Sequence, residues 1–472
     1  MEPTLAWYSV LPFVAMLLAI AVLPLISSTQ HWWERNRNQL LVALVLGVPV
    51  AVWMLALFGP LTVAEALVEY SQFIILLGAL FTISGGIHLS GDLPAKPAVN
   101  GAFLGIGALT ASFIGTTGAA MLLIRPLLKT NSERSHKAHT VIFFIFTVAN
   151  AGGLLTPLGD PPLFLGFLRG VPFTWTFHLF PQWLFVNALL LATYLALDKV
   201  MYQREDPGDI AWDSTHVEPL EVLGKINFVY LAVVVLSVAF VPSIDMHAIE
   251  QGTATWTQWV PWRELVMVAA LARSLVRGSK RVRYHLNEFS WAPILEVAAL
   301  FIGIFLTMIP ALKVLGQVAP KLPLNDVTFF VFTGGLSSML DNAPTYATFF
   351  GMAQALQPDP DVAGLVAGVA PSHLAAISLG AVFCGALTYI GNGPNFMVKA
   401  VAEQDGVQMP SFGGYALWAI TWLAPILVAM AFVFIAGQWW AKIVGVALTL
   451  LLLVRIWAVA NNKSHTTPPQ RR

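Results

Sequence analysis

Long apolar segments recur along the whole chain, and they constrain its fold more than any other feature. A helix of about 20 apolar residues matches the hydrocarbon core of a bilayer, which is about 30 Å thick. Hydrophobic residues make up 57% of the sequence and charged residues 11%, whereas soluble domains carry about 25% charged residues. We therefore predict an all-α polytopic membrane protein, embedded in the lipid bilayer and without a soluble domain.

Eleven segments are expected to cross the membrane, and two others to enter it without crossing. The expected spans are 5–28, 39–58, 63–89, 138–168, 173–198, 226–243, 262–276, 290–313, 370–400, 413–436 and 439–459. The segments 98–128 and 327–356 carry small, polar or proline residues at their centres, which a straight membrane helix does not favour. We predict that both are re-entrant hairpins, with their tips at 115–118 and 341–344.

The distribution of positive charge sets the orientation. With two hairpins, one side of the membrane holds 17 of the 25 Lys and Arg residues, and the opposite loops hold five. Because cytoplasmic loops carry the excess of Lys and Arg, the loop 277–288 and the tail 460–472 are predicted to be cytoplasmic. The N-terminus and the loop 357–372 are then external. The net charge of zero indicates no general attraction to nucleic acid.

One motif occurs twice, about half the chain length apart. GLLTPLGDPPLF at 153–164 and GALTYIGNGPNF at 385–396 agree at six of twelve positions. In the predicted topology the two copies run in opposite directions. We predict a single transporter domain, 1–472, built from inverted repeats at about 39–200 and 262–436, the architecture of many secondary transporters.

Proline and glycine interrupt the helix that carries each copy of the motif, because proline lacks a backbone donor and glycine permits bends. The predicted helix-breaking residues are Pro157, Gly159, Pro161, Pro162, Gly391, Gly393 and Pro394. Irregular backbone inside a membrane is tolerated where it is buried in protein or lines a cavity. Two such breaks, facing two hairpin tips, are predicted to form ion or substrate sites.

Two aspartates are the main candidates for cation binding. Asp341 lies at the second tip beside Asn342, and carboxylate, amide and carbonyl oxygens suit a hard cation such as Na⁺. The alternative is that Asp341 only caps a helix. Asp160 precedes two prolines, which is also typical of a helix start. The other candidate ligands are Thr116, Thr117, Thr156, Thr388, Asn150, Asn392 and Asn395. His136 and His139 are expected to be solvated in a charged loop.

The stretches NAGGLLTPLGDPPLF (150–164) and SSMLDNAPTY (337–346) resemble signatures of the ion transporter superfamily. The similarity is greatest to the branch that holds D-type sodium/proton antiporters and proteins described as citrate transporters. It implies inverted repeats, two hairpins, two unwound helices and a homodimer, with sodium and proton as transported or coupling ions. It also implies a place in a bacterial inner membrane. The first tip, Gly115-Thr116-Thr117, departs from the Asp-Asn and Ser-Asn-Thr tips of such relatives.

Sodium/proton antiport by alternating access fits these residues best, with Asp341 as the site that either ion can occupy. Cation-coupled transport of citrate or a dicarboxylate is the alternative, because helix N-termini can hold carboxylates. Two other functions are open as distant alternatives, an intramembrane aspartyl protease and a channel. We expect a transporter that is not an enzyme and has no cofactor.

Overall fold

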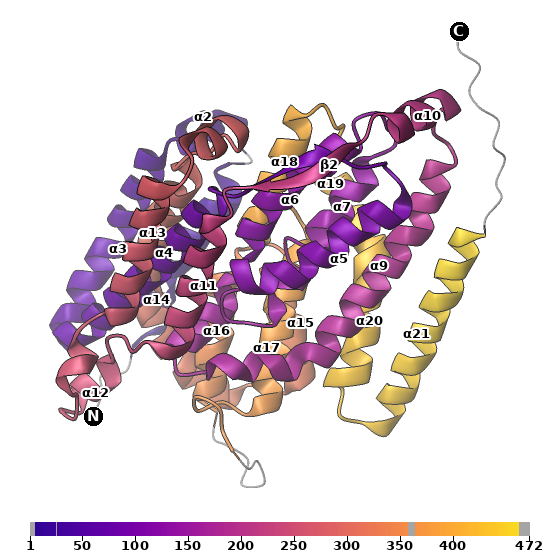
Figure 1. Ribbon diagram of the computed structural model, residues 1–472. Helices are drawn as coiled ribbons and strands as arrows, with labels where there is room; N and C mark the ends of the chain where they lie inside the picture. Colours follow the sequence, from indigo (N-terminus) through magenta and orange to yellow (C-terminus); the bar gives the residue numbers. More distant parts are fainter. Residues whose placement is uncertain (1–4, 25, 357–363, 462–472) are drawn as a thin grey trace.

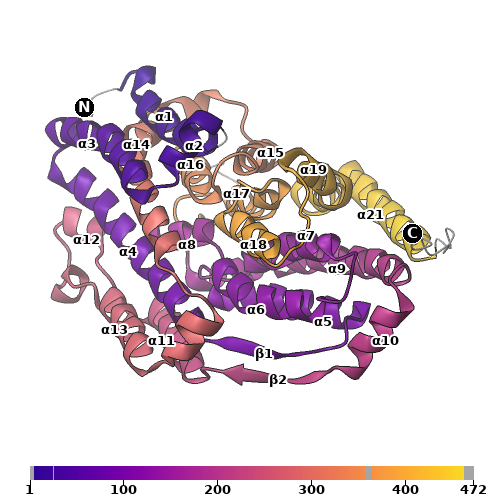
Figure 2. The same ribbon diagram turned by 90° about the horizontal axis from the view of Figure 1, so that it is seen from above.

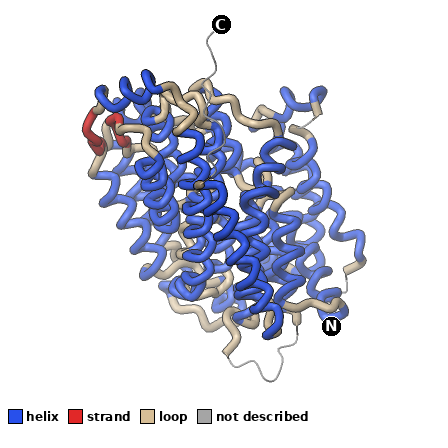
Figure 3. Tube along the Cα trace, turned by 90° about the vertical axis from the view of Figure 1, so that its right-hand side faces the viewer, coloured by secondary structure: helices blue, strands red, loops and turns tan. Residues whose placement is uncertain are grey.

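The structure is a computed structural model that describes residues 5–24, 26–356 and 364–461. It is built almost entirely of helices, as Figures 1 and 3 show. The predicted loop 357–372 lies partly outside the described residues, and so does the tail after Asn461. The helices fall into two groups, which lie side by side when the molecule is seen from above (Figure 2).

The first helix group contains the principal helices α1, α3, α4, α11, α13 and α14, which pack on one another. Their bounds are α1 (Leu11–Val22), α3 (Asn36–Phe58), α4 (Pro60–Ser84), α11 (Ile226–Phe240), α13 (Trp262–Arg277) and α14 (Ala292–Val318). The shorter elements of this part of the chain are η1 (Trp7–Val10), α2 (Ser27–Trp33), α12 (Met246–Glu250), η4 (Trp256–Trp259), η5 (Arg281–Leu286) and η6 (Ala319–Lys321).

The second helix group contains two stretches of the chain. The first stretch forms α5 (Pro97–Ile114), α6 (Thr116–Thr130), α7 (Ala138–Thr147), η2 (Ala151–Leu154), α8 (Pro161–Leu168), η3 (Phe173–Leu179), α9 (Phe180–Tyr202) and α10 (Pro207–Thr215). The second forms α15 (Asp326–Ser337), α16 (Asn342–Gln354), α17 (Pro371–Cys384), η7 (Gly385–Leu387), α18 (Gly393–Gln404), α19 (Phe412–Trp418), η8 (Ala419–Leu423), α20 (Ala424–Met430), η9 (Ala431–Ile435) and α21 (Trp439–Ala460).

Seven helical segments of the described chain are long and apolar enough to cross a membrane. They are 36–58, 60–84, 97–114, 173–202, 292–321, 412–435 and 439–460. Six of them match expected spans, and 97–114 is the first half of the expected hairpin 98–128. The helical, polytopic membrane character is therefore confirmed. The total of eleven spans and the re-entrant placement of the hairpins stay predictions.

A short antiparallel sheet was not predicted from the sequence. It pairs β1 (His88–Asp92) with β2 (Glu218–Leu223), in a register that places His88 opposite Leu223 and Asp92 opposite Glu218. The expected span 63–89 therefore ends early, because α4 stops at Ser84. Figure 3 shows the sheet at one end of the helical body.

Charged pairs gather at the same end as the sheet. Lys129 Nζ lies 2.6 Å from Glu218 Oε2, and Arg125 Nη2 lies 2.7 Å from Glu288 Oε2. Figure 1 places α2, α10 and β2 at this end, with α12 at the opposite one. Loops that the charge distribution assigned to one side thus lie at one end of the molecule.

His139 corrects one expectation at this end. Its side chain is only 4% exposed, and its Nε2 lies 2.9 Å from Asp198 Oδ1. Arg134 contacts the same carboxylate at 2.6 Å and is equally buried. His139 is therefore part of a buried ionic cluster and is not a solvated loop residue. The side chain of His136 is 47% exposed, as expected.

Helices from the two expected repeats pack against each other in matched pairs. In the first group α3 packs on α14, and α13 packs on α4. In the second group α6 packs on α18, and α16 packs on α8. Each pair joins residues of 39–200 to residues of 262–436. The pairs bring both predicted breaks and both predicted tips toward the middle of the second group.

Candidate functional site

Both copies of the repeated motif form irregular backbone between two helices. The first lies between α7 and α8, and the second between α17 and α18, each with a short 3-10 turn inside it. We call these two segments, 148–160 and 385–392, the first and second break. The predicted helix-breaking prolines and glycines all lie in a break or at the start of the helix that follows it.

The two breaks share their internal geometry. The Thr156 hydroxyl donates a hydrogen bond to the carbonyl oxygen of Ser112, and the Thr388 hydroxyl donates to that of Ser338 at 2.5 Å. Ser112 and Ser338 occupy matching positions before the two tips. The same threonine therefore fastens each break to the neighbouring tip, which accounts for its presence in both copies.

Glycine allows each break to fold back on itself. A Cβ atom on Gly159 would overlap the carbonyl oxygen of Gly153, and a Cβ on Gly391 would overlap that of Gly385. These two glycine pairs are matched positions of the repeat. At the first tip Gly115 alone separates α5 from α6, with φ at +81°. Side chains other than glycine rarely adopt such a φ.

Four helices begin where the breaks meet the tips. They are α6, α8, α16 and α18, which start at Thr116, Pro161, Asn342 and Gly393. A helix N-terminus carries a partial positive charge of about half an elementary charge. The N-terminal ends of four helices therefore meet at the centre of the second group, and their partial positive charge favours a negative group there.

The side chain of Asp160 lies at this centre, and it joins both tips and both breaks. Its carboxylate accepts hydrogen bonds from the Thr116 hydroxyl at 3.1 Å and from the side-chain amides of Asn342 at 2.5 Å and Asn392 at 3.2 Å. Thr116 comes from the first tip, Asn342 from the second tip and Asn392 from the second break. Asp160 itself is only 1% exposed. No ion pair of the described residues includes it, so only neutral groups hydrogen-bond to it.

A second layer of asparagines supports this cluster. Asn392 also donates to Asn150 Oδ1 at 3.2 Å, and Asn150 donates to Asn395 Oδ1 at 2.6 Å. Asn395 in turn donates to the carbonyl oxygens of Gly385 and Thr388, at 2.8 and 3.0 Å. The second break is thereby tied to the first by side-chain amides that are all buried.

One oxygen of the cluster lacks a partner. Asn342 is fully buried, and the hydrogen bond from its amide nitrogen to Asp160 fixes the side chain. Among the described residues its Oδ1 finds no hydrogen-bond donor. Buried acceptors are nearly always satisfied, so an orphan acceptor beside a carboxylate requires an explanation. An amide oxygen beside a carboxylate is a donor set that suits a hard cation.

Asp341 has a different environment from Asp160. It is the N-cap of α16, where its Oδ1 accepts a hydrogen bond from the backbone nitrogen of Ala343 at 3.0 Å. Its side chain is half-buried, and among the described residues no hydrogen bond connects it to Asp160. Thr117 is also half-buried and lies one residue beyond Thr116, outside the hydrogen bonds of Asp160. The remaining candidate residues from the sequence belong to the cluster or to its supports.

Ser112 and Ser337 belong to the site although sequence reasoning did not select them. The Ser112 hydroxyl donates to the carbonyl oxygen of Gly152 at 2.5 Å and accepts from the backbone nitrogen of Leu155 at 3.1 Å. Ser337 donates to the carbonyl oxygen of Ala381 at 2.7 Å. The match between Ser112 and Ser338 in the repeat was the signal that could have identified this part of the tips.

A helical membrane protein whose two broken helices surround a buried polar centre has the features of an ion or solute transporter. A comparison of the chain with families gives the particular family. The model for the family described as "Putative citrate transport" matches residues 2–435, and the chain belongs to this family. This confirms the resemblance seen in the motifs, and it supports the expectation that the chain is a transporter and not an enzyme. No curated protein matched the chain closely enough to count as a relative.

Proposed function

We propose that this protein is a secondary active transporter in which Asp160 binds a cation, and that it exchanges sodium for protons. The observation that carries the proposal is the position of Asp160, whose carboxylate is hydrogen-bonded to both tips and to the second break. A cation bound there would be held by all four segments together. When it is ionised, the Asp160 carboxylate gives the cluster a formal negative charge, which a bound cation would balance.

The chemistry of exchange follows from competition for one carboxylate. Sodium binds the ionised carboxylate together with neutral oxygens such as Asn342 Oδ1. A proton removes the charge and releases the sodium. If the site opens to each side of the membrane in turn, binding of one ion on one side displaces the other ion, which leaves on that side. Because a single carboxylate exchanges one sodium ion for one proton, no net charge crosses the membrane, and the ion gradients rather than the membrane potential drive the exchange.

The repeat itself indicates one charged site and not two. Asn392 occupies in the second break the position that Asp160 occupies in the first. Its amide serves as a donor to Asp160, so the two matched residues form one pair. We therefore propose one titrating carboxylate per chain at this centre. Inverted repeats and a homodimer belong to the same proposal, and they rest on the sequence motif and the family resemblance.

Cation-coupled citrate transport is the second candidate, and two observations favour it. The family description names citrate, and four helix N-termini meet at the cluster, where they could hold carboxylate groups. A citrate trianion beside Asp160 would be repelled unless a cation accompanied it. In this reading Asp160 holds the coupling cation and the helix N-termini hold the organic anion.

Transport by the purified protein in proteoliposomes separates the two candidates. A trapped pH-sensitive dye reports sodium-driven proton movement, and labelled citrate reports uptake under the same sodium gradient. We expect sodium-driven proton movement in the wild type and at least a tenfold lower rate in Asp160→Asn. Asp405→Asn is the matched control, because Asp405 is exposed at the end of α18.

Each result decides between the candidates. Citrate uptake without sodium-driven proton movement would replace exchange by citrate transport, with Asp160 still required. Exchange that survives in Asp160→Asn at the wild-type rate would remove Asp160 from the mechanism. Neither activity in the wild type would overturn both candidates.

A further inference from the structure

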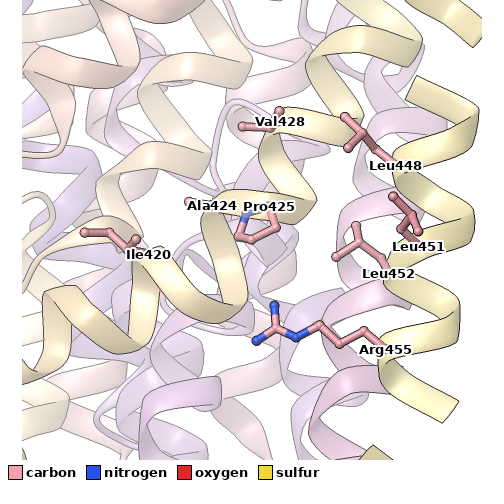
Figure 4. Close-up of a pocket in the computed structure, with 8 residues that line it drawn as sticks. All are labelled: Ile420, Ala424, Pro425, Val428, Leu448, Leu451, Leu452 and Arg455. Atoms are coloured by element: carbon pink, nitrogen blue, oxygen red, sulfur yellow. The ribbon is translucent and has the colours of Figure 1, made fainter. Parts of the chain in front are cut away.

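An apolar groove lies between the last two membrane helices, far from Asp160 along the chain. It has a volume of about 420 Å³ and lies between the η8–α20 segment and α21, as Figure 4 shows. Seven apolar residues line it, among them Ile420, Val428 and Leu451, which are 62%, 46% and 65% exposed. Its one charged lining residue is Arg455.

The groove exists because the helix opposite α21 is distorted. Pro425 cannot donate a backbone hydrogen bond to the carbonyl oxygen of Thr421, and π-helical turns lie on both sides of α20. Arg455 Nη1 donates to this Thr421 oxygen at 2.8 Å. The guanidinium carbon also lies 4.0 Å from the centre of the Trp422 ring. These contacts position Arg455 at one end of the groove.

The Thr421 oxygen satisfies one N–H group of Arg455, but neither contact neutralises the positive charge of the guanidinium. No carboxylate of the described chain forms an ion pair with Arg455, although the residue lies in a span-length apolar helix. A charge inside such a helix is costly and usually has a partner. Among the described residues Nε and Nη2 of Arg455 have no hydrogen-bond partner, and a guanidinium binds a phosphate through two parallel hydrogen bonds. An anion at this end of the groove would supply the missing partner.

We propose that the groove binds an anionic phospholipid, with its phosphate on Arg455 and an acyl chain along Ile420, Val428 and Leu448. The residues that follow α21 add Lys463, Arg471 and Arg472 and no acidic residue. Positive charge next to the end of a membrane helix attracts anionic lipid. The apolar groove and Arg455 at its end therefore fit the two ends of one lipid.

A second copy of this chain is a less suitable occupant. Copies in one membrane share the same orientation, and a two-fold interface through the groove would bring Arg455 of each copy to the same depth. Like charges repel strongly where the dielectric constant is low. An anionic lipid places opposite charges together in the same position.

Lipid retention by the purified full-length protein tests the site. The probes are dioleoyl phosphatidylglycerol and dioleoyl phosphatidylcholine in mixed micelles, and native mass spectrometry counts the lipids that stay bound. Loss of one Arg contact at a membrane surface removes about 1 kcal/mol, which is about a fivefold loss of affinity. We expect that loss for phosphatidylglycerol in Arg455→Gln, whose amide can still donate to Thr421.

Three other variants complete the design. Lys442→Gln, an exposed cation at the opposite end of α21, should retain phosphatidylglycerol like the wild type. Arg455→Lys keeps the charge and should keep the preference for phosphatidylglycerol, even if Arg455→Gln folds poorly. Leu448→Trp fills the groove and should reduce retention of both lipids.

Several results would overturn the site. Equal retention of phosphatidylglycerol by the wild type and Arg455→Gln would do so, and so would no preference over phosphatidylcholine in the wild type. A shift from dimer to monomer in Arg455→Gln, without any change in bound lipid, would assign the groove to a second copy.

Discussion

Asp160 and Asp341 each precede a helix, and the residues that follow decide what each carboxylate can bind. A capping carboxylate bonds to the backbone N–H groups of the first helical turn. After Asp160 the first two positions are Pro161 and Pro162, which have no N–H, and the structure shows no side-chain cap. After Asp341 the nitrogen of Ala343 is available and is bonded. The two prolines therefore leave the Asp160 carboxylate to side-chain partners.

This difference predicts different results for substitutions at the neighbouring positions 341 and 342. Asp341→Asn should keep sodium/proton exchange within a few-fold of the wild type, because asparagine is also a good cap. Asn342→Ala should raise the half-saturating sodium concentration about tenfold or more. It removes a hydrogen bond to a carboxylate, which contributes about 1.5–3 kcal/mol, and an oxygen beside it. Initial exchange rates over a range of sodium concentrations measure both effects. Loss of exchange in Asp341→Asn, with exchange intact in Asp160→Asn, would return the coupling role to Asp341.

The two breaks are compact elements, and their stability depends on glycine pairs. Gly159→Ala and Gly391→Ala each place a methyl group on the carbonyl oxygen of a partner glycine. Overpacking of this kind typically costs about 1–3 kcal/mol. Both variants should therefore melt at a lower temperature in detergent, as measured by tryptophan fluorescence. Gly393→Ala is the control, because nothing lies within 4 Å of its added Cβ. If Gly159→Ala melted at the wild-type temperature, the first break would have more space around position 159 than the structure shows.

The whole molecule has two ends, and the charge distribution predicts which one faces the cytoplasm. We expect a cysteine at position 280 to react with an impermeant maleimide only in inside-out vesicles. A cysteine at position 365 should react only in intact cells. Both positions are exposed, and the native Cys384 is buried, so Cys384→Ala provides a clean background. Labelling of both positions from the same side would contradict the hairpins and the inverted repeat together.

The sequence predicted the helical membrane class and the two helix breaks, because apolar length, proline and glycine act locally. It also selected Asp160, Thr116, Asn342 and Asn392, which the structure brings together. The sequence favours Asp341 over Asp160 as the ion site, because an apolar segment makes a carboxylate conspicuous but does not show that a backbone N–H group of the first helical turn engages it. The burial of His139 depends on Asp198, 59 residues away, and local pattern carries no information about such a contact.

The small sheet has a mechanical consequence. β1 belongs to the connection that leads from the first helix group to the second, and β2 to the connection that returns. Figure 2 shows the two strands running together along one edge, between the two groups. Because the strands are hydrogen-bonded to each other, the two connections act as a single two-stranded tether of fixed register between the helix groups. Any displacement between the groups must stretch or bend both connections at once. A one-residue deletion in β1 would therefore also change how far the β2 connection lets the two helix groups move relative to each other.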